Sequence, residues 1–113
     1  MRPAGRPDVE EILRRVVEKI RRDYDPEKII LFGSYARGEP SEDSDIDLFI
    51  VKETDKRPID RFVEVSEITY ERGLKAIISP LIYTPEEVQE RLDLGDDFVE
   101  EVLSKGRLVY AKG

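Results

Sequence analysis

The 113-residue chain contains no cysteine and no histidine. Without cysteine, the protein can form neither a disulfide framework nor a catalytic thiolate. Without histidine, proton transfer and metal binding fall to carboxylates, lysine, tyrosine or solvent. These two absences exclude thiol enzymes and any catalytic triad that needs an imidazole.

Thermolabile residues are also scarce. Asparagine is absent, glutamine occurs once as Gln89, and the single methionine is Met1. Charged residues make up 40% of the chain, against roughly 25% in a typical domain. Enrichment in Glu, Lys and Arg together with loss of thermolabile residues is typical of thermophile proteins, so we expect a thermophilic host.

Long apolar runs are missing as well. No stretch approaches the roughly 20 residues of a membrane span, and the first residues, MRPAGRPDVEE, have no signal-peptide core. We therefore expect a cytoplasmic protein. A net charge of −7 argues against direct nucleic-acid binding, because phosphate contacts need a basic face.

The length predicts one domain, residues 1–113, with a single core. Apolar periodicity predicts helices and strands in alternation. The expected helices are Asp8–Tyr24, Asp55–Arg72 with Gly73 as its stop, and a region capped by Thr84, broken at Gly95 and ended by Gly106. The expected strands are Lys28–Ser34, Asp45–Lys52, Leu74–Thr84 and Arg107–Ala111.

This order predicts an α+β (α/β-like) fold, in which a small mixed β-sheet is backed by helices. Pro80 marks its strand as an edge or bulged strand. In the second expected helix, Ile59, Phe62, Val63 and Ile68 lie towards one side and predict its buried face.

The most informative stretch is Leu31–Val51, LFGSYARGEPSEDSDIDLFIV. Strand alternation places Asp45 and Asp47 on the same face, and paired carboxylates suit Mg²⁺. Gly33 and Ser34 offer backbone N–H groups and a hydroxyl to a phosphate, and Arg37 adds a fixed positive charge. Together these residues predict a metal-dependent nucleotide site.

Two similar patterns fail on specific residues. Glu39 stands where a P-loop needs lysine. Leu48 and Thr54 stand where a calcium-binding EF-hand loop needs its glycine and its glutamate. An acidic surface turn that only caps a strand stays open as the alternative to such a site. The function of Tyr35 also stays open, since this residue either covers the loop or stacks near a nucleotide.

The segment GSYARGEPSEDSDIDLFI resembles the signature of the minimal nucleotidyltransferases, small members of the polymerase-β-type nucleotidyltransferase superfamily. The resemblance implies an NTP and two Mg²⁺ ions, with Asp45 and Asp47 as catalytic metal ligands. Gly33, Ser34, Arg37 and Ser44 are the nucleotide-binding residues that it implies. The reaction would transfer a nucleoside monophosphate, AMP from ATP, to an acceptor.

The same resemblance implies a partner. Small nucleotidyltransferases of this type are commonly paired with a helical HEPN protein, often a ribonuclease toxin, and act as its antitoxin by masking or adenylylating it. The oligomeric state, homo- or hetero-oligomer, stays open.

The superfamily usually carries a third carboxylate on a later strand, and this position falls at or near Ser79 here. Serine cannot replace a carboxylate as anionic ligand or base. Three explanations stay open: the acid comes from elsewhere, the partner supplies it, or transfer is lost and the protein binds nucleotide or neutralises its partner without catalysis. The candidates for an acid from elsewhere are Glu64, Glu67, Asp96 and Asp97.

Overall fold

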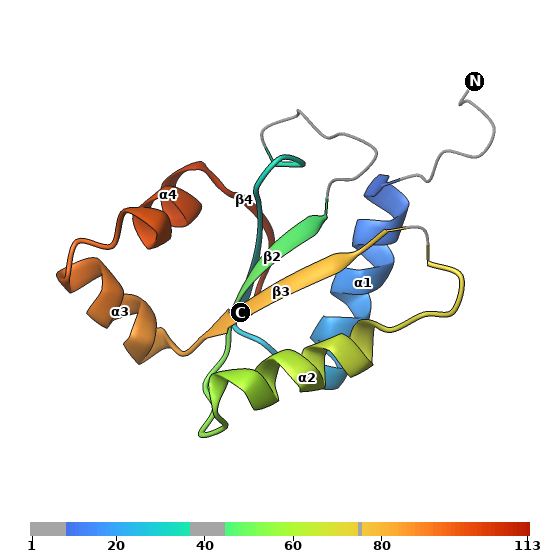
Figure 1. Cartoon of the computed structure of the whole chain (residues 1–113), viewed down its shortest axis with the longest axis horizontal. Coiled ribbons are helices and arrows are strands. Elements are labelled where there is room, and N and C mark those ends of the chain that lie inside the picture. The colour runs from blue at the N-terminus through green and yellow to red at the C-terminus, as the bar shows by residue number, and fades with distance from the viewer. Residues whose placement is uncertain (1–8, 37–44, 75) are drawn as a thin grey trace.

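The computed structural model describes residues 9–36, 45–74 and 76–113. It contains a four-stranded mixed sheet in the order β3-β2-β1-β4, with helices on both faces (Figure 1). The strands are β1 Lys28–Phe32, β2 Ile46–Val51, β3 Ile78–Tyr83 and β4 Arg107–Ala111. The helices are α1 Val9–Tyr24, α2 Pro58–Thr69, α3 Pro85–Asp93 and α4 Asp97–Lys105. The predicted fold class is confirmed.

The two central strands carry the core. β1 pairs antiparallel with β2 and β4, and β2 pairs parallel with β3. Helices α1 and α2 cover one face of the sheet, where Ile46, Leu48 and Ile50 are fully buried. On the other face, Phe49 and Val51 pack against residues of α4. β2 is thus buried on both sides, which its unbroken apolar run Leu48–Val51 favours.

The layer formed by α3 and α4 is thin. α3 buries no residue, and α4 buries only Val99 and Val102 among the described residues. Gly106 lets the end of α4 approach β1, since a Cβ at Gly106 would lie 2.5 Å from the side chain of Ile30. The cover provided by α4 is therefore tight over Ile30, beside the end of β1 that leads to the Gly33 turn.

The predicted helix Asp55–Arg72 is shorter in the structure. α2 begins at Pro58, because a residue that precedes proline disfavours the helical region, and Arg57 is extended with ψ 154°. The helix ends at Thr69, since Tyr70 is already extended with ψ 132°. Gly73 does have a positive φ of 82°, but it belongs to the following turn and is not the residue that stops the helix.

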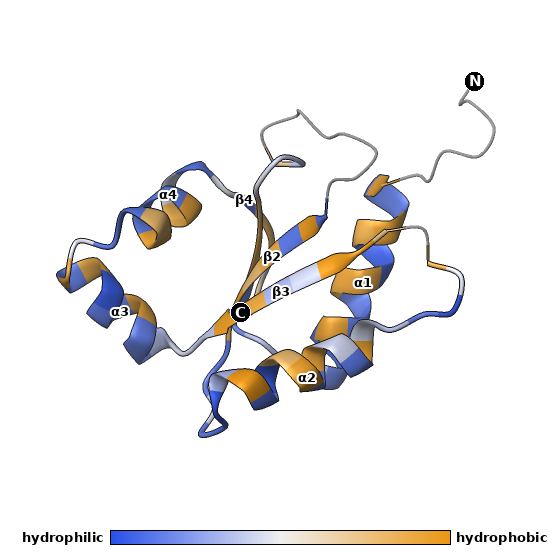
Figure 2. Ribbon diagram, in the orientation of Figure 1, coloured by the Kyte–Doolittle hydropathy of each residue, from blue (hydrophilic) through white to orange (hydrophobic). Residues whose placement is uncertain are grey.

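The predicted buried face of α2 is wrong for three of its four residues, since only Ile68 packs against the core. Ile59, Phe62 and Val63 are 59%, 44% and 45% exposed, and the helix instead buries Arg61, Val65 and Thr69. Figure 2 shows orange, apolar segments along α2. An exposed apolar helix face of this kind is typical of a surface that another chain covers.

Both edges of the sheet are protected against further pairing. The carbonyls of Ile77 and Tyr83 accept from the N–H groups of the first residue of β2 and of the residue that follows its end, so alternation turns the backbone of Pro80 and Ile82 outward. Pro80 has no N–H, and the Ile82 carbonyl already accepts from Arg61 Nη1 at 3.3 Å. At the opposite edge, a register shift interrupts the pairing of β4 with β1. Proline and bulges are common devices that protect sheet edges, and the prediction that Pro80 lies on an edge strand is confirmed.

Arg61 joins α2, β3 and α3 through one buried guanidinium, which is 5% exposed. Its Nε donates to the Lys56 carbonyl at 2.7 Å, and its Nη1 and Nη2 donate to the Glu87 carboxylate at 2.7 and 3.3 Å. The hydrogen bond from Arg61 lowers the pKa of Glu87. Glu87 also accepts from the Thr84 N–H at 2.8 Å, which completes the predicted capping box of α3.

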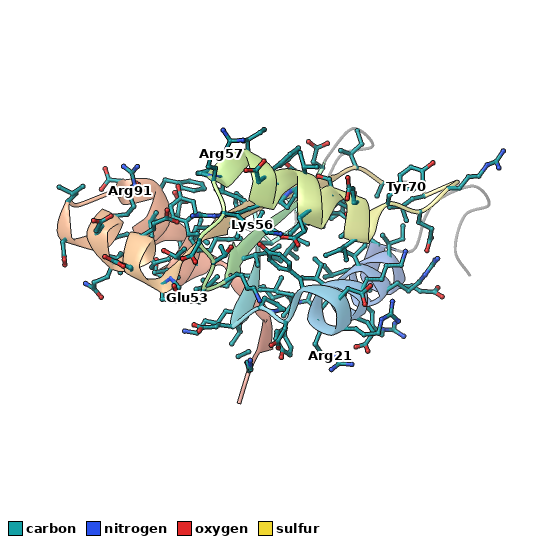
Figure 3. The ribbon with its side chains drawn as sticks, turned by 90° about the horizontal axis from the view of Figure 1, so that it is seen from below. Arg21, Glu53, Lys56, Arg57, Tyr70 and Arg91 are labelled. Atoms are coloured by element: carbon teal, nitrogen blue, oxygen red, sulfur yellow. The ribbon has the colours of Figure 1, made fainter. Side chains whose placement is uncertain are left out.

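We expect Arg61→Met to lower the free energy of unfolding by about 2–4 kcal/mol, because the carbonyls of Lys56 and Ile82 lose their donor and Glu87 loses its counter-ion. Urea unfolding followed by circular dichroism measures this change. Arg57→Met is the matched control, because Arg57 pairs with Asp60 at the surface (Figure 3) with a 78% exposed side chain. An equal loss in both variants would contradict a structural role of the buried network.

Within the described residues, no helix combines the length and the apolar character that crossing a membrane requires.

Candidate functional site

Asp47 lies in the middle of a row of residues that crosses three strands. Its register partners are Phe32 on β1 and Ser79 on β3. Alternation directs Asp47 to the same face as Phe49, the face on which α4 packs. Ile46 is fully buried on the opposite face, and Asp45 comes immediately before it. The polar part of β2 is thus at its first residues, next to the turn that follows β1 (Figure 1).

The turn after β1 is in contact with this carboxylate. Gly33 has a φ of 78°, and a Cβ built on it would lie 2.2 Å from Asp47 Oδ2. Only glycine fits this position, both because its φ is positive and because the carboxylate occupies the space of a side chain. Two parts of the predicted site, the Gly33-Ser34 turn and the second aspartate, therefore meet in the folded chain.

We expect Gly33→Ala to displace the Asp47 carboxylate and to weaken nucleotide binding at least tenfold. Gly95→Ala is the matched control, because Gly95 has a similar φ of 77° but nothing within 4 Å of the place that a Cβ would take. Both variants share the backbone strain, about 1 kcal/mol, so any difference between them reports the contact with Asp47. Isothermal titration with Mg²⁺-ATP and thermal unfolding measure the two effects, and equal binding by both variants would refute this role of Gly33.

Ser79 occupies the position next to Asp47 on the neighbouring strand. Its backbone pairs in parallel register with Asp47, and paired residues of adjacent strands project on the same face. A carboxylate at Ser79 would therefore stand beside Asp47. Ser79 thus lies where a third acid would join Asp45 and Asp47.

The four other candidates for the third acid do not join this site. Glu64 and Glu67 are on α2, which covers the opposite face of the sheet, and Glu64 pairs with Lys56 Nζ at 2.9 Å. Asp96 caps α4 by accepting from the N–H groups of Phe98 and Val99. Asp97 follows it in the exposed first turn of α4. Across residues 9–36, 45–74 and 76–113, no three acidic, cysteine or histidine side chains gather closely enough to hold a metal ion.

Two predicted nucleotide-binding residues, Arg37 and Ser44, lie outside the described residues, as does the predicted helix cap Asp8. Tyr35 packs against the core that α1 and α2 form with the sheet. This position favours the interpretation that Tyr35 covers the loop.

A hollow of about 260 Å³ between the Gly33 turn and α4 was not predicted from the sequence. Its lining residues include Phe32, Gly33, Phe98, Glu101, Val102 and Lys105. The lining residues that belong to α4 fall at positions i, i+3, i+4 and i+7 of the helix. In the sequence this spacing is indistinguishable from that of an ordinary amphipathic helix. Only the packing of α4 on β1 shows that this face borders the candidate site.

The chemistry of the donors present fits a magnesium ion. Asp45 and Asp47 supply hard anionic oxygens, and Mg²⁺ commonly takes one or two carboxylates and completes its shell with phosphate oxygens and water. Asp47 Oδ2 already faces the Gly33 turn, so an ion held by this carboxylate would lie beside the backbone that is expected to hold the phosphates.

Comparison with known proteins identifies the family of the chain. The sequence pattern of the family described as "Nucleotidyltransferase domain" matches residues 13–109. Three proteins of Methanocaldococcus jannaschii, each named "Putative protein adenylyltransferase", are similar to the chain. The first is 36% identical over 85 residues, which is 74% of this chain and 77% of that protein. The others are 44% identical over 43 residues and 41% identical over 61 residues, and these matches span 50% and 59% of their lengths.

A crystal structure from Sulfolobus solfataricus, titled as that of "a putative nucleotidyltransferase", has the same fold, with a TM-score of 0.59 at 21% identity. The match covers 97% of this chain and 94% of that one. Since the family pattern extends over residues 13–109, which is most of the chain, the chain belongs to the nucleotidyltransferase domain family of enzymes.

Proposed function

We propose that the protein transfers AMP from ATP to a hydroxyl group of a partner protein and releases pyrophosphate, as the antitoxin of a HEPN-type pair. The observation that carries the proposal is the contact between the Asp47 carboxylate and Gly33, which joins the metal ligand to the phosphate-binding turn. The names of the Methanocaldococcus jannaschii relatives support AMP as the group transferred and a protein as the acceptor.

In this reaction the acceptor oxygen forms a bond to the α-phosphorus, and the bond from that phosphorus to the β-phosphate bridging oxygen breaks. Pyrophosphate leaves, and the hydroxyl proton passes to a carboxylate or to water. Asp45 and Asp47 would hold the Mg²⁺, which neutralises charge that develops on the phosphates. Gly33 and Ser34 would orient the polyphosphate through backbone N–H groups and a hydroxyl.

The partner part of the proposal has its own support. α2 exposes Ile59, Phe62 and Val63, and an apolar helix face suits a helical partner. Both sheet edges are protected, so pairing of an added strand is disfavoured. A helical HEPN-type protein is therefore the partner that we propose.

Ser79 favours a second function. A chain with the phosphate turn and the metal pair but no third carboxylate could bind Mg²⁺-ATP and neutralise its partner by forming a complex, without transferring AMP. The two functions share the nucleotide site and differ only in whether the acceptor becomes modified.

Incubation of the protein with α-labelled ATP, Mg²⁺ and a helical protein encoded by a neighbouring gene would distinguish them. Label on the partner, absent with the Asp47→Asn variant, supports transfer of AMP. A stable complex and saturable ATP binding without label support the second function. Absence of both nucleotide binding and complex formation would refute both.

A further inference from the structure

The hollow beside the Gly33 turn adjoins the candidate site directly. Gly33 lines it on one side and contacts the Asp47 carboxylate on the other. Its volume of about 260 Å³ is below the 300–1,000 Å³ of pockets that enclose a whole drug-sized ligand. The hollow therefore suits one part of a nucleotide whose remainder lies on the turn and the aspartates.

Two aromatic rings form one wall of the hollow. Phe98 of α4 meets Phe32 of β1 edge-to-face, with ring centroids 5.5 Å apart and an interplanar angle of 79°. Although Phe98 packs against the sheet, 40% of it remains exposed. An exposed aromatic ring at the border of a polar site offers a surface on which a flat ring can stack.

The rim of the hollow carries one acceptor and one donor. Glu101 and Lys105 both line it, one helical turn apart on α4, and no side-chain hydrogen bond or ion pair joins either of them to another described residue. A carboxylate accepts hydrogen bonds and an ammonium group donates them. The pair thus matches the edge of a base that has an amino group and a ring nitrogen.

The same residues disfavour phosphate in the hollow. Phe32, Phe98 and Val102 offer it no donor, and the Glu101 carboxylate would oppose the attraction that the Lys105 ammonium exerts on it. Phosphate oxygens favour backbone N–H groups and metal ions, which places them at Gly33 and the aspartates. The two ends of a nucleotide are therefore directed to different parts of the site.

We propose that this hollow receives the nucleobase of the substrate, with Phe98 against the face of the ring and Glu101 accepting from its exocyclic amine. The inference rests on the proposed function, which makes the base adenine. Phe98 and Glu101 then determine the preference for ATP, and the Gly33 turn and the aspartates contribute binding energy that is the same for every nucleotide.

The test compares Mg²⁺-ATP with Mg²⁺-tripolyphosphate, which has no base, by isothermal titration. Phe98→Ala is expected to weaken ATP binding about tenfold, as loss of one base–aromatic stack would, and to leave tripolyphosphate binding unchanged. Leu103→Ala is the matched control, since Leu103 is on the same helix and 37% exposed but outside the hollow's lining. Phe98→Leu, which retains bulk without the flat ring, should resemble Phe98→Ala and excludes unfolding as the cause.

Glu101→Gln tests the amine contact. Inosine triphosphate carries a carbonyl where ATP carries the amine, and a glutamine amide can donate to that carbonyl. We expect this variant to shift the preference from ATP towards inosine triphosphate by about tenfold. Equal affinities of the wild type for ATP and tripolyphosphate, or unchanged nucleotide preferences in the Phe98→Ala and Glu101→Gln variants, would contradict the assignment of this hollow to the base. Failure of the wild type to bind either compound would refute the proposed function itself.

Discussion

Replacement of Asp47 by asparagine is expected to abolish Mg²⁺-dependent binding of ATP without unfolding the protein. Asparagine has almost the same shape, so the contact with Gly33 can persist, but the anionic oxygen that holds the metal is lost. Mutations of residues that merely support a metal ligand typically reduce affinity 10–100-fold. A direct ligand should therefore cost at least about a hundredfold.

The melting temperature without Mg²⁺ should change little, and any change should be a small increase. Asp45 and Asp47 repel each other when no cation lies between them, and removal of either charge relieves that repulsion. Isothermal titration with Mg²⁺-ATP measures the affinity, and thermal unfolding without Mg²⁺ measures the stability. Asp45→Asn should behave in the same way.

Asp97→Asn is the control for this prediction. It makes the same chemical change at an exposed residue in the first turn of α4 that does not line the hollow, and it should leave ATP binding unchanged. Unchanged ATP affinity in both the Asp45 and Asp47 variants would contradict the assignment of these carboxylates as metal ligands. A large loss in the Asp97 variant would instead indicate a general effect of charge.

The elements of the fold were largely predictable because their signals are local. The strand that ends at glycine, the capping box of Thr84 and Glu87 and the break at Gly95 all depend on neighbouring residues. The face of α2 was not predictable. An exposed stripe and a buried stripe have the same period, and only the sheet decides that Arg61 and Val65 turn inward.

The candidate site, like the fold, was predictable from the sequence only in part. The D-x-D pattern and the Gly33-Ser34 turn stand in one stretch of sequence, so their chemistry could be predicted before their contact was seen. The relation of Asp47 to Ser79 depends on the register of two strands, and the hollow depends on the packing of α4 on β1. Such long-range geometry leaves no signature in a single sequence.

The register of β2 and β3 makes the consequence of Ser79 testable. Ser79→Asp is expected to raise the rate of AMP transfer to the partner by at least about a hundredfold, because a positioned general base typically contributes 10²–10⁴-fold. The new carboxylate would stand beside Asp47 on the adjacent strand, where it could both accept the hydroxyl proton and hold a second Mg²⁺. Ser79→Asn, which adds the same bulk without the charge, is the matched control.

The dependence of the melting temperature on Mg²⁺ tests the Ser79 variants independently of the transfer rate. Three carboxylates on one face repel one another, so Ser79→Asp should unfold at a lower temperature than Ser79→Asn without Mg²⁺. Saturating Mg²⁺ should reverse that order, since an ion bound only to the folded state stabilises it. Reversal together with faster transfer would show that this serine limits catalysis in the natural chain. Reversal without faster transfer would mean that the chain holds the metal but that no acceptor is correctly placed for reaction. This outcome is expected of a protein that neutralises its partner by binding alone. No reversal would mean that residue 79 lies outside the metal site, and would contradict the role proposed for this position.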